Sequence, residues 1–488
     1  MYFKKATPES VGISSANIIK MLKNFEKHNI PMHSMLIARG DKLIYEGYWE
    51  PMKAEDNHRM YSQTKSYVGT AVSQLIAEGK LKLDDKIIDY FPESLPEKVH
   101  PYLAAQTIGH MLDMHTCFTG CNWFELHNGD RVKCYFAMEP SHYPGTVFHY
   151  DSTGSFILGA LVQKITGKTF LEYLKEKCLD KIGFSKNSKA LTCPGGFAWG
   201  DSALLCTPMD MLLFGRLLAN KGEWNGEQLL DRKAVEETTA VERTCGARSY
   251  EFSSHGYGRQ VWRTYEDSFS FFGMHNQFMI HNPKTDITFV CTAGCQRGSS
   301  GLAKEVIYGS LFDLIVDEAK DTALPESDAY NKLLSLTKDL KLTTAIGNTT
   351  SSIVDEINGK TFKMCDNPMG LKEFTIKLDG DKGEFNYVNA QGEKTIKFGL
   401  LENVLQQFPE TGYSKEIGGI ISEGNTYLCA ASAAWTNDNK FKLLVQIIDE
   451  YIGILDVIVG FNDGKAVVEM IGDAEDFLKE YNGCATSE

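Results

Sequence analysis

The sequence predicts a mixed α/β domain followed by a smaller domain of antiparallel strands. Two strand-like runs, at residues 34–38 and 42–49, precede a long apolar stretch with helical character. From Gly359 onward, the helical pattern gives way to short alternating strands separated by turns. We therefore predict an α/β domain over residues 1–325, a helical linker over 326–345 and an antiparallel sheet or small barrel over 346–488.

The composition is that of a globular protein, and its charge narrows the range of partners. Of the 488 residues, 43% are hydrophobic and 23% are charged, and no apolar run approaches the ~18 residues of a membrane span. A formal net charge of −14 argues against binding to nucleic acid, which requires a basic surface. The first ten residues lack the apolar core of a secretory signal. We expect a cytoplasmic protein that acts on a small molecule, with no nucleic-acid or membrane partner, while the oligomeric state stays open.

The twelve cysteines are scattered along the chain, and several lie in apolar runs where a thiol behaves as a small hydrophobic group. We expect them to be reduced. Two pairs could be read as metal ligands, Cys117 with Cys121 near His115 and Cys291 with Cys295. Neither pair has the tight Cys-x-x-Cys spacing of a zinc site or a matching second pair. The sequence therefore predicts no metal and no other cofactor.

Further helices and strands follow from the spacing of apolar residues. An amphipathic helix is expected over residues 12–29, because its apolar residues recur on one face. The strand at 287–291 and the helix at 303–316 would complete an α/β sandwich with the N-terminal strands. Other helices are expected over residues 107–114, 153–166 and 210–217, and C-terminal strands over 373–378, 394–398, 441–448 and 454–459.

A Ser-x-x-Lys sequence, from Ser62 to Lys65, opens the apolar helix after the two N-terminal strands. Positions i and i+3 lie one above the other on a helix, so the serine hydroxyl and the lysine amine can share one small volume. The N-terminus of a helix also offers unpaired N–H groups that can stabilise an oxyanion. A nucleophile beside a base in this setting predicts acyl transfer through a serine ester.

The tetrapeptide alone is weak evidence for catalysis. A serine at a strand-to-helix junction can simply cap the helix while the lysine is solvated. A second Ser-x-x-Lys occurs from Ser335 to Lys338 in a polar helical stretch. Only the surrounding sequence distinguishes the two.

Three phrases of the sequence resemble one known family. They are Ser62-x-x-Lys65 itself, the Glu78-Gly79-Lys80-Leu81 and Leu83-Asp84-Asp85 phrase after its helix, and Thr107-Ile108-Gly109-His110-Met111-Leu112. Together they look like the serine β-lactamase and penicillin-binding protein superfamily, and within it the class C-like esterase branch. The resemblance covers roughly residues 5–320 and implies an antiparallel sheet flanked by helices, an all-helical insert, and hydrolysis through an acyl-enzyme on Ser62.

Tyr150 and Ser152 resemble the second motif of this family, Tyr-x-Asn or Tyr-x-Ser, because they follow a Pro-Gly turn and lead into a helix. A neighbouring ammonium, which Lys65 could supply, and a helix N-terminus would both favour the tyrosinate anion. Tyr150 would then accept the serine proton, pass it to the leaving group and activate the deacylating water. Whether Lys65 or Tyr150 is the base stays open, because strongly coupled sites titrate as a unit.

The third family motif, Lys-Thr-Gly or a variant of it, matches Phe271-Phe272-Gly273 here. The glycine would let a strand approach the substrate closely, which makes the N–H of Met274 the second oxyanion donor beside that of Ser62. Phe271 replaces the lysine that faces a substrate carboxylate in the family. His275 could supply the missing polar function, or it could be structural, as a lone histidine beside a strand more often is.

A long region at residues 115–148 is rich in aromatic side chains. Long loops are usually functional, so these rings could form the wall of a substrate pocket. They could equally form a satellite hydrophobic cluster beneath the loop. The residues are Phe118, Trp123, Phe124, His127, Tyr135, Phe136 and Tyr143.

The predicted function is hydrolysis of a small ester or amide. Because the third motif has no lysine, neutral and partly hydrophobic substrates are expected to be preferred over penicillins. A peptidase or amidase for D-amino-acid substrates is the alternative enzyme, and a catalytically silent binding or assembly protein is the alternative of another class. The C-terminal β domain shows no catalytic constellation and could pack on the hydrolase domain or cover the pocket mouth. The predicted site comprises Ser62, Lys65 and Tyr150 for catalysis and Ser152, Gly273, Met274 and His275 around the substrate.

Overall fold

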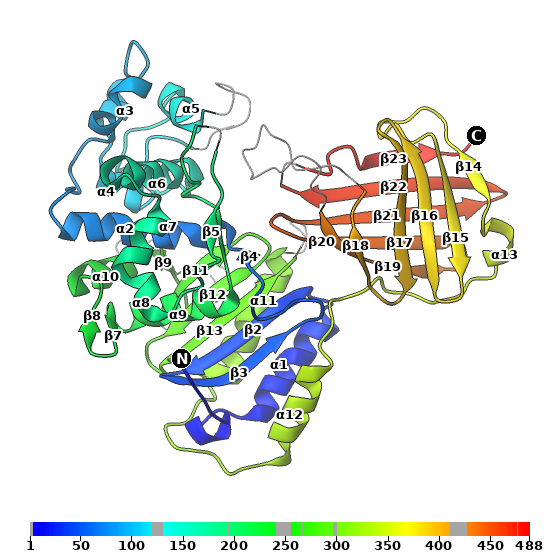
Figure 1. Ribbon diagram of the computed structural model, residues 1–488, viewed down its shortest axis with the longest axis horizontal. Helices are drawn as coiled ribbons and strands as arrows, with labels where there is room; N and C mark the ends of the chain where they lie inside the picture. The colour runs from blue at the N-terminus through cyan, green and yellow to red at the C-terminus, as the bar shows by residue number, and fades with distance from the viewer. Residues whose placement is uncertain are drawn as a thin grey trace. The chain divides into compact units, whose positions relative to one another are not determined.

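The computed structural model describes residues 3–119, 130–193, 195–240, 255–265, 267–295, 300–409, 427–475 and 477–488. Among these residues the chain divides into two units, the first ending at Lys341 and the second beginning at Leu342. Each unit contains a large sheet of its own (Figure 1). The predicted order, a mixed α/β part followed by an antiparallel β part, is confirmed.

An eight-stranded sheet forms the centre of the first unit. Its strands are β1 (Lys4–Lys5), β2 (Met32–Arg39), β3 (Lys42–Tyr48), β9 (Gly256–Tyr257), β10 (Trp262–Arg263), β11 (Phe269–Gly273), β12 (Gln277–Asn282) and β13 (Ile287–Ala293). They lie in the order β1-β3-β2-β13-β12-β11-β10-β9, and neighbours are antiparallel except for β1 beside β3. In this register Leu36 of β2 lies opposite Val290 of β13. Strands from both ends of the α/β region therefore pair at the middle of the sheet.

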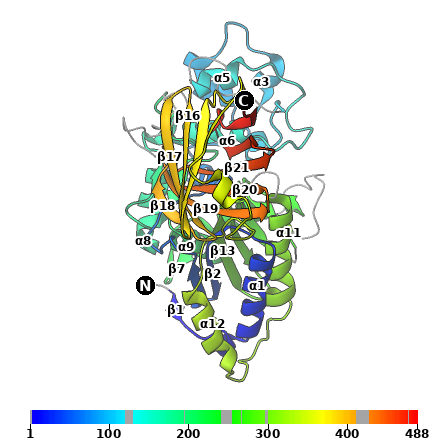
Figure 2. The same cartoon turned by 90° about the vertical axis from the view of Figure 1, so that its right-hand side faces the viewer.

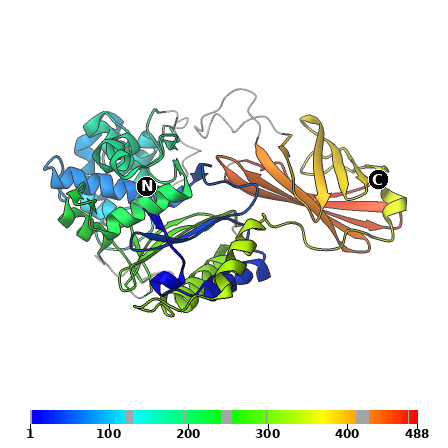
Figure 3. The same ribbon diagram turned by 60° about the horizontal axis from the view of Figure 1, so that its bottom comes forward.

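Helices cover both faces of this sheet (Figures 1 and 3). One face carries α1 (Ser15–Lys27), α11 (Ser300–Leu311) with its π-helical continuation (Phe312–Val316), and α12 (Asp328–Lys338). The other face carries α9 (Pro208–Ala219), and α2 (Thr64–Ala77) packs mainly against other helices. Phe25, Phe289 and Ile307 belong to the core beneath the first set, and Leu333 of α12 belongs to the same core. The helix that was expected to be a linker thus contributes to the core of the first unit.

A mostly helical region lies between β3 and β9 in the chain, where the all-helical insert is expected. Its helices are α3 (Pro101–Ala105), α4 (Ile108–Leu112), α5 (Arg131–Ala137), α6 (Ser152–Thr166), α7 (Phe170–Leu174), α8 (Asp180–Ile182) and α10 (Arg232–Thr239), in addition to α2 and α9. Short strands also occur there, in a three-stranded sheet of β4 (His58–Arg59), β6 (Leu204–Cys206) and β5 (Lys189–Ala190) and a pair of β7 (Glu223–Trp224) and β8 (Glu227–Gln228). None of the described helices combines the length and apolar character that crossing a membrane requires.

The start of α9 differs from the expected one. The sequence places the beginning of this helix at Asp210, whereas the helix begins at Pro208 and Thr207 is its N-cap. The Thr207 hydroxyl accepts a hydrogen bond from the Asp210 N–H at 3.2 Å, and the Asp210 carboxylate accepts one from the Thr207 N–H at 2.9 Å. Asp210 is therefore the third residue of a capping box rather than the residue that opens the helix.

The second unit is a ten-stranded sheet that curls on itself. Its strands are β14 (Thr361–Lys363), β15 (Glu373–Asp379), β16 (Lys382–Asn389), β17 (Gly392–Leu400), β18 (Val404–Gln407), β19 (Leu428–Asn437), β20 (Lys440–Ile448), β21 (Ile452–Asn462), β22 (Lys465–Ala474) and β23 (Asn482–Thr486). Neighbours are antiparallel except where β17 meets β19. Figures 1 and 2 show β16 and β17 running across β20 and β21. This curled sheet confirms the predicted antiparallel sheet or small barrel.

We expect a chain that ends at Lys341 to fold by itself, because the main core of the first unit is built from residues between Ile13 and Leu333. The full chain should then show two thermal transitions in calorimetry, and the shortened chain should keep one of them at a similar temperature. A shortened chain that is insoluble, while the full chain unfolds in one step, would contradict this expectation.

Candidate active site

Ser62 lies at the junction between β4 and α2, directly after a strained residue. Tyr61 is buried and has a φ of 47°, a left-handed conformation that is unfavourable for a bulky side chain. The Arg59 guanidinium lies 4.5 Å from the centroid of the Tyr61 ring, and the His275 ring meets it edge-on at 5.2 Å. These contacts hold the strained residue in place, so packing fixes the position of Ser62.

Lys65 is buried, with 1% of its surface exposed, and it faces the serine. Its Nζ donates a hydrogen bond to Ser62 Oγ at 2.8 Å and another to the Asp201 carbonyl at 2.9 Å. A buried ammonium needs such partners, because desolvation penalises an isolated charge. The structure therefore brings Ser62 and Lys65 together, whereas Ser335 and Lys338 of the second Ser-x-x-Lys are exposed on α12.

Tyr150 lies beside this pair. The Lys65 Nζ is 5.1 Å from the centroid of the Tyr150 ring, which is a cation–π distance. The Trp262 indole stacks on the same ring, with 5.3 Å between centroids and 24° between planes. Tyr257 meets both rings edge-on, at 6.2 Å from Tyr150 and 4.8 Å from Trp262. The Tyr150 ring thus contacts the lysine of the first motif and an aromatic cluster from β9 and β10.

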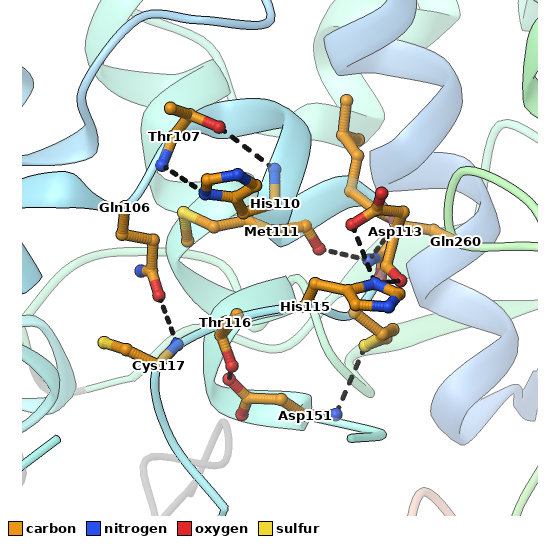
Figure 4. Close-up of polar contacts among 12 residues, drawn as sticks. Gln106, Thr107, His110, Met111, Asp113, His115, Thr116, Cys117, Asp151 and Gln260 are labelled. Carbon is orange, nitrogen blue, oxygen red and sulfur yellow. Dashed lines mark hydrogen bonds and ion pairs between the residues drawn. The ribbon is translucent and has the colours of Figure 1, made fainter. Parts of the chain in front are cut away.

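Asp151 anchors the segment that carries Tyr150 (Figure 4). It is the N-cap of α6 and accepts hydrogen bonds from the Thr153 N–H and the Thr116 hydroxyl, both at 2.8 Å. Its own N–H points to Met114 Sδ at 3.2 Å. Ser152 is half-buried at the start of α6, and among the described residues no hydrogen bond joins its hydroxyl to the first motif.

Gly273 allows the third motif to approach the nucleophile segment. A Cβ atom at Gly273 would lie 2.1 Å from the Met60 carbonyl oxygen, so no larger residue fits without a backbone shift. Phe271 does not face the site, because it is fully buried and packs against Tyr67 at 6.3 Å and Phe214 at 5.8 Å. The expectation that Phe271 takes the place of a substrate-facing lysine is therefore corrected: its side chain belongs to the core.

The turn after Gly273 is held by the side chains of three buried residues. His275 Nδ1 lies 2.6 Å from the Cys295 carbonyl, and the Asn276 amide donates to the Ser300 carbonyl at 3.1 Å. The Gln277 amide donates to the Met274 carbonyl at 3.0 Å and to the Ala293 carbonyl at 2.7 Å. Met274 itself is half-buried. These contacts favour the structural alternative for His275 and leave Met274 as the partly exposed residue of the turn.

The aromatic region at 115–148 is only partly a loop, since it contains α5. Phe118, Tyr135 and Phe136 are buried and stack edge-on, with Tyr135 5.0 Å from Phe118 and 5.3 Å from Phe136. These three rings form a satellite cluster, while Tyr143 is 54% exposed. Trp123, Phe124, His127 and the metal-ligand candidate Cys121 lie outside the described residues. No group of three potential metal ligands occurs within the part of the chain that the structure describes.

Two contacts of the candidate site could not be predicted from the sequence. The Asp201 carbonyl that accepts from Lys65 is a backbone group, so no residue type marks it. Trp262 is visible in the sequence, but nothing there places it against Tyr150. The arrangement thus gathers a serine hydroxyl, a buried amine and a tyrosine, which are residue types used in acyl transfer.

His33 and His58 form a buried pair close to the same segment in sequence and space. His33 Nδ1 lies 2.8 Å from His58 Nε2, and His58 Nδ1 lies 3.0 Å from the Arg59 carbonyl. The carbonyl can only accept, so His58 carries its proton on Nδ1 and accepts a hydrogen bond from His33. Burial lowers the pKa of His33 and lowers that of His58 to about 4, and nearby His275 acts in the same direction on both.

The neutral state of His58 makes stability depend on pH. Its pKa is 6.5 in an unfolded chain and about 4 in the folded one, so the unfolded state binds the proton first as the pH falls. The contribution of His58 to the free energy of unfolding is fully present above pH 6.5. It falls by about 3 kcal/mol as the pH drops towards 4. Urea unfolding at several pH values should show this loss, and a smaller loss in His58→Gln. His28→Gln, at an exposed histidine, is the control that should match the wild type; equal slopes for all three proteins would show that His58 is not responsible.

The candidate site lies within the part of the chain that resembles known proteins. A family model described as Beta-lactamase matches residues 18–301. The 6-aminohexanoate-dimer hydrolase of Paenarthrobacter ureafaciens is 23% identical over 278 residues, covering 53% of this chain and 71% of that protein. Protein flp of Staphylococcus aureus strain N315 is 25% identical over 194 residues, covering 36% of this chain and only 38% of that protein. A solved octameric penicillin-binding protein homologue from Pyrococcus abyssi has a similar fold, with a TM-score of 0.50 and 15% identity, over 97% of this chain and 99% of that one.

Proposed function

Because this chain belongs to the β-lactamase family of serine hydrolases, we propose that it cleaves small, neutral esters or amides through an acyl-enzyme on Ser62. The observation that carries the proposal is the hydrogen bond of 2.8 Å between Lys65 Nζ and Ser62 Oγ, formed by a lysine that is almost fully buried. A solvated lysine beside a capping serine would show neither feature. The catalytic interpretation is therefore favoured over a silent binding protein.

In the proposed reaction, Ser62 Oγ attacks the substrate carbonyl while its proton passes to the unit formed by Lys65 and Tyr150. That unit returns the proton to the leaving alcohol or amine as the carbon–oxygen or carbon–nitrogen bond breaks. A water molecule then gives a proton to the same unit and attacks the acyl carbon of the ester on Ser62. The bond from that carbon to Ser62 Oγ breaks, Oγ takes the proton back from the unit, and the acid is released. The hydrogen bond from Lys65 Nζ to Ser62 Oγ and the cation–π contact of the same Nζ with the Tyr150 ring support treating Lys65 and Tyr150 as one base.

The developing oxyanion would be stabilised by the backbone N–H groups of Ser62 and Met274. The missing Cβ of Gly273 supports this pairing, because it lets the end of β11 lie against the backbone of Met60. One such donor is worth roughly 10²–10³ in rate when it is positioned for the transition state. Ser152 at the start of α6 is proposed to contact the substrate rather than the nucleophile.

An amidase is the second candidate. The relative from Paenarthrobacter ureafaciens is named for hydrolysis of a 6-aminohexanoate dimer, and the dimer of an amino acid is joined by an amide bond. Esters and amides share the same acyl-enzyme, so the site is compatible with both. They differ in the leaving group, since an amine must receive a proton before it departs whereas a nitrophenolate does not.

The Ser62→Ala variant should lose hydrolysis of a nitrophenyl ester and labelling by a fluorophosphonate, because it removes the nucleophile. Ser335→Ala, at the exposed second Ser-x-x-Lys, is the matched control and should behave as the wild type. An active Ser62→Ala protein would end the assignment.

Tyr150→Phe keeps the ring against Trp262 and removes only the hydroxyl, so its kcat should fall by roughly 10²–10⁴ with an unchanged melting temperature.

Neutral substrates should be turned over with a kcat/KM at least ten times that of a chromogenic cephalosporin. No lysine occupies the third motif, His275 is engaged with Cys295, and the chain has a net charge of −14. The missing charge-assisted hydrogen bond to a carboxylate is worth roughly ten- to a hundredfold in binding. A nitrophenyl ester, a nitroanilide and the cephalosporin should be compared on one enzyme batch. A preference for the cephalosporin would require another cation at the carboxylate and would overturn the substrate class.

A further inference from the structure

Gln260 is a buried, strained residue that the reaction described above does not use. It lies between β9 and β10, is 1% exposed and has a φ of 63°. The left-handed conformation is unfavourable for a non-glycine residue and persists only where its surroundings require it. The contacts of Gln260 must therefore hold its backbone in this conformation.

Both the side chain and the backbone of Gln260 are hydrogen-bonded to separate segments. Its Nε2 donates to the Met111 and Leu112 carbonyls, each at 3.0 Å, and its backbone N–H donates to Leu112 at 3.0 Å. Figure 4 shows Gln260 reaching the carbonyl of Met111. Its Oε1 accepts from the Ser155 hydroxyl at 2.6 Å, and its carbonyl accepts from the Ser66 hydroxyl at 2.8 Å.

Two of these partners lie on α2, which carries Lys65, and on α6, which begins two residues after Tyr150. Ser66 follows Lys65 directly on α2, and Ser155 is in the first turn of α6, just after Tyr150. Gly69 of α2 makes the approach possible, because a Cβ atom there would lie 2.6 Å from the Arg259 carbonyl and 2.7 Å from Gln260 Cβ. Gln260 thus joins α2 to α6 at close range.

The same segment also supports the tyrosine ring. Trp262, two residues after Gln260, stacks on Tyr150 at 5.3 Å. We propose that Gln260 is a positioning residue that sets the distance between the Ser62–Lys65 pair and Tyr150. This inference rests on the proposed function, because it assigns Gln260 no contact with the substrate and acts only through Tyr150.

Loss of the Gln260 side-chain amide should lower the rate of proton transfer more than the affinity for substrate. Gln260→Met keeps the length of the side chain and removes the side-chain hydrogen bonds to Met111, Leu112 and Ser155. The backbone hydrogen bonds of residue 260 to Leu112 and Ser66 remain. A misplacement of about 1 Å between reacting groups can cost on the order of 100-fold in rate. We expect kcat per titrated active site to fall roughly 10- to 100-fold with little change in KM.

Two milder variants test the hydrogen bonds of Gln260 to α2 and to α6 one at a time. Ser66→Ala breaks the link to α2, and Ser155→Ala breaks the link to α6, each by removal of one oxygen atom. Ser73→Ala is the matched control, because Ser73 is another buried serine on α2 whose hydroxyl contacts Thr238 at 3.0 Å instead. We expect a lower kcat in the first two and a wild-type kcat in the control, which separates positioning from general loosening of α2.

The decisive measurement is a double-mutant cycle with Tyr150→Phe. If Gln260 acts through the tyrosine, Gln260→Met should cost little or nothing further in the Tyr150→Phe background, because residues that act as a unit are not additive. The rate of fluorophosphonate labelling gives a second readout where turnover is slow. An equal loss in both backgrounds, or no loss in the wild-type background, overturns the inference. Activity in Ser62→Ala would instead overturn the proposed function, so the two failures are distinguishable.

Discussion

The site depends on the buried amine of Lys65 and on the contacts that surround it. A polar group with almost no contact with water must be compensated by nearby hydrogen-bonding groups, because burial without partners is costly. Here the compensation comes from Ser62 Oγ, the Asp201 carbonyl and the face of Tyr150. These groups lie on three different segments of the first unit. The contacts of one buried amine therefore bring together the three groups that the proposed reaction uses.

Glycines at close contacts, with strained residues beside them, allow these segments to approach one another. Gly273 and Gly69 are positions where a Cβ atom would collide with backbone or side-chain atoms of the neighbouring segment. Tyr61 and Gln260 hold left-handed conformations beside them. Each strained residue is buried among specific contacts, so tertiary packing maintains a backbone that local preference disfavours. These two strained residues therefore lie beside the segments that carry Ser62 and Tyr150.

The sequence predicts those parts of the molecule whose signals are local. Ser62 and Lys65 are one helical turn apart, and the alternating strands after Gly359 differ in period from the α/β region, so the pair and the two folds could be predicted. The Asp201 carbonyl and the stack of Trp262 on Tyr150 could not, because they join distant segments and one of them is a backbone group. Phe271 was misplaced for the same reason: its neighbours Tyr67 and Phe214 come from α2 and α9. Which aromatic residues of the 115–148 region are buried likewise depends on tertiary contacts.

The pairing of β2 with β13 has a consequence for how the chain is made. Ser34 and Thr292, which share a hydrogen bond of 2.6 Å, are 258 positions apart in the sequence. During synthesis, the N-terminal hairpin leaves the ribosome long before its main partner strand exists, and one edge of β2 stays unpaired for that time. Non-local closure of this kind is slow, because the entropy of a long loop is lost before the contacts that offset it can form. Chaperones that shield an exposed strand edge would thus act on this protein at one definite stage, between translation of β3 and translation of β13.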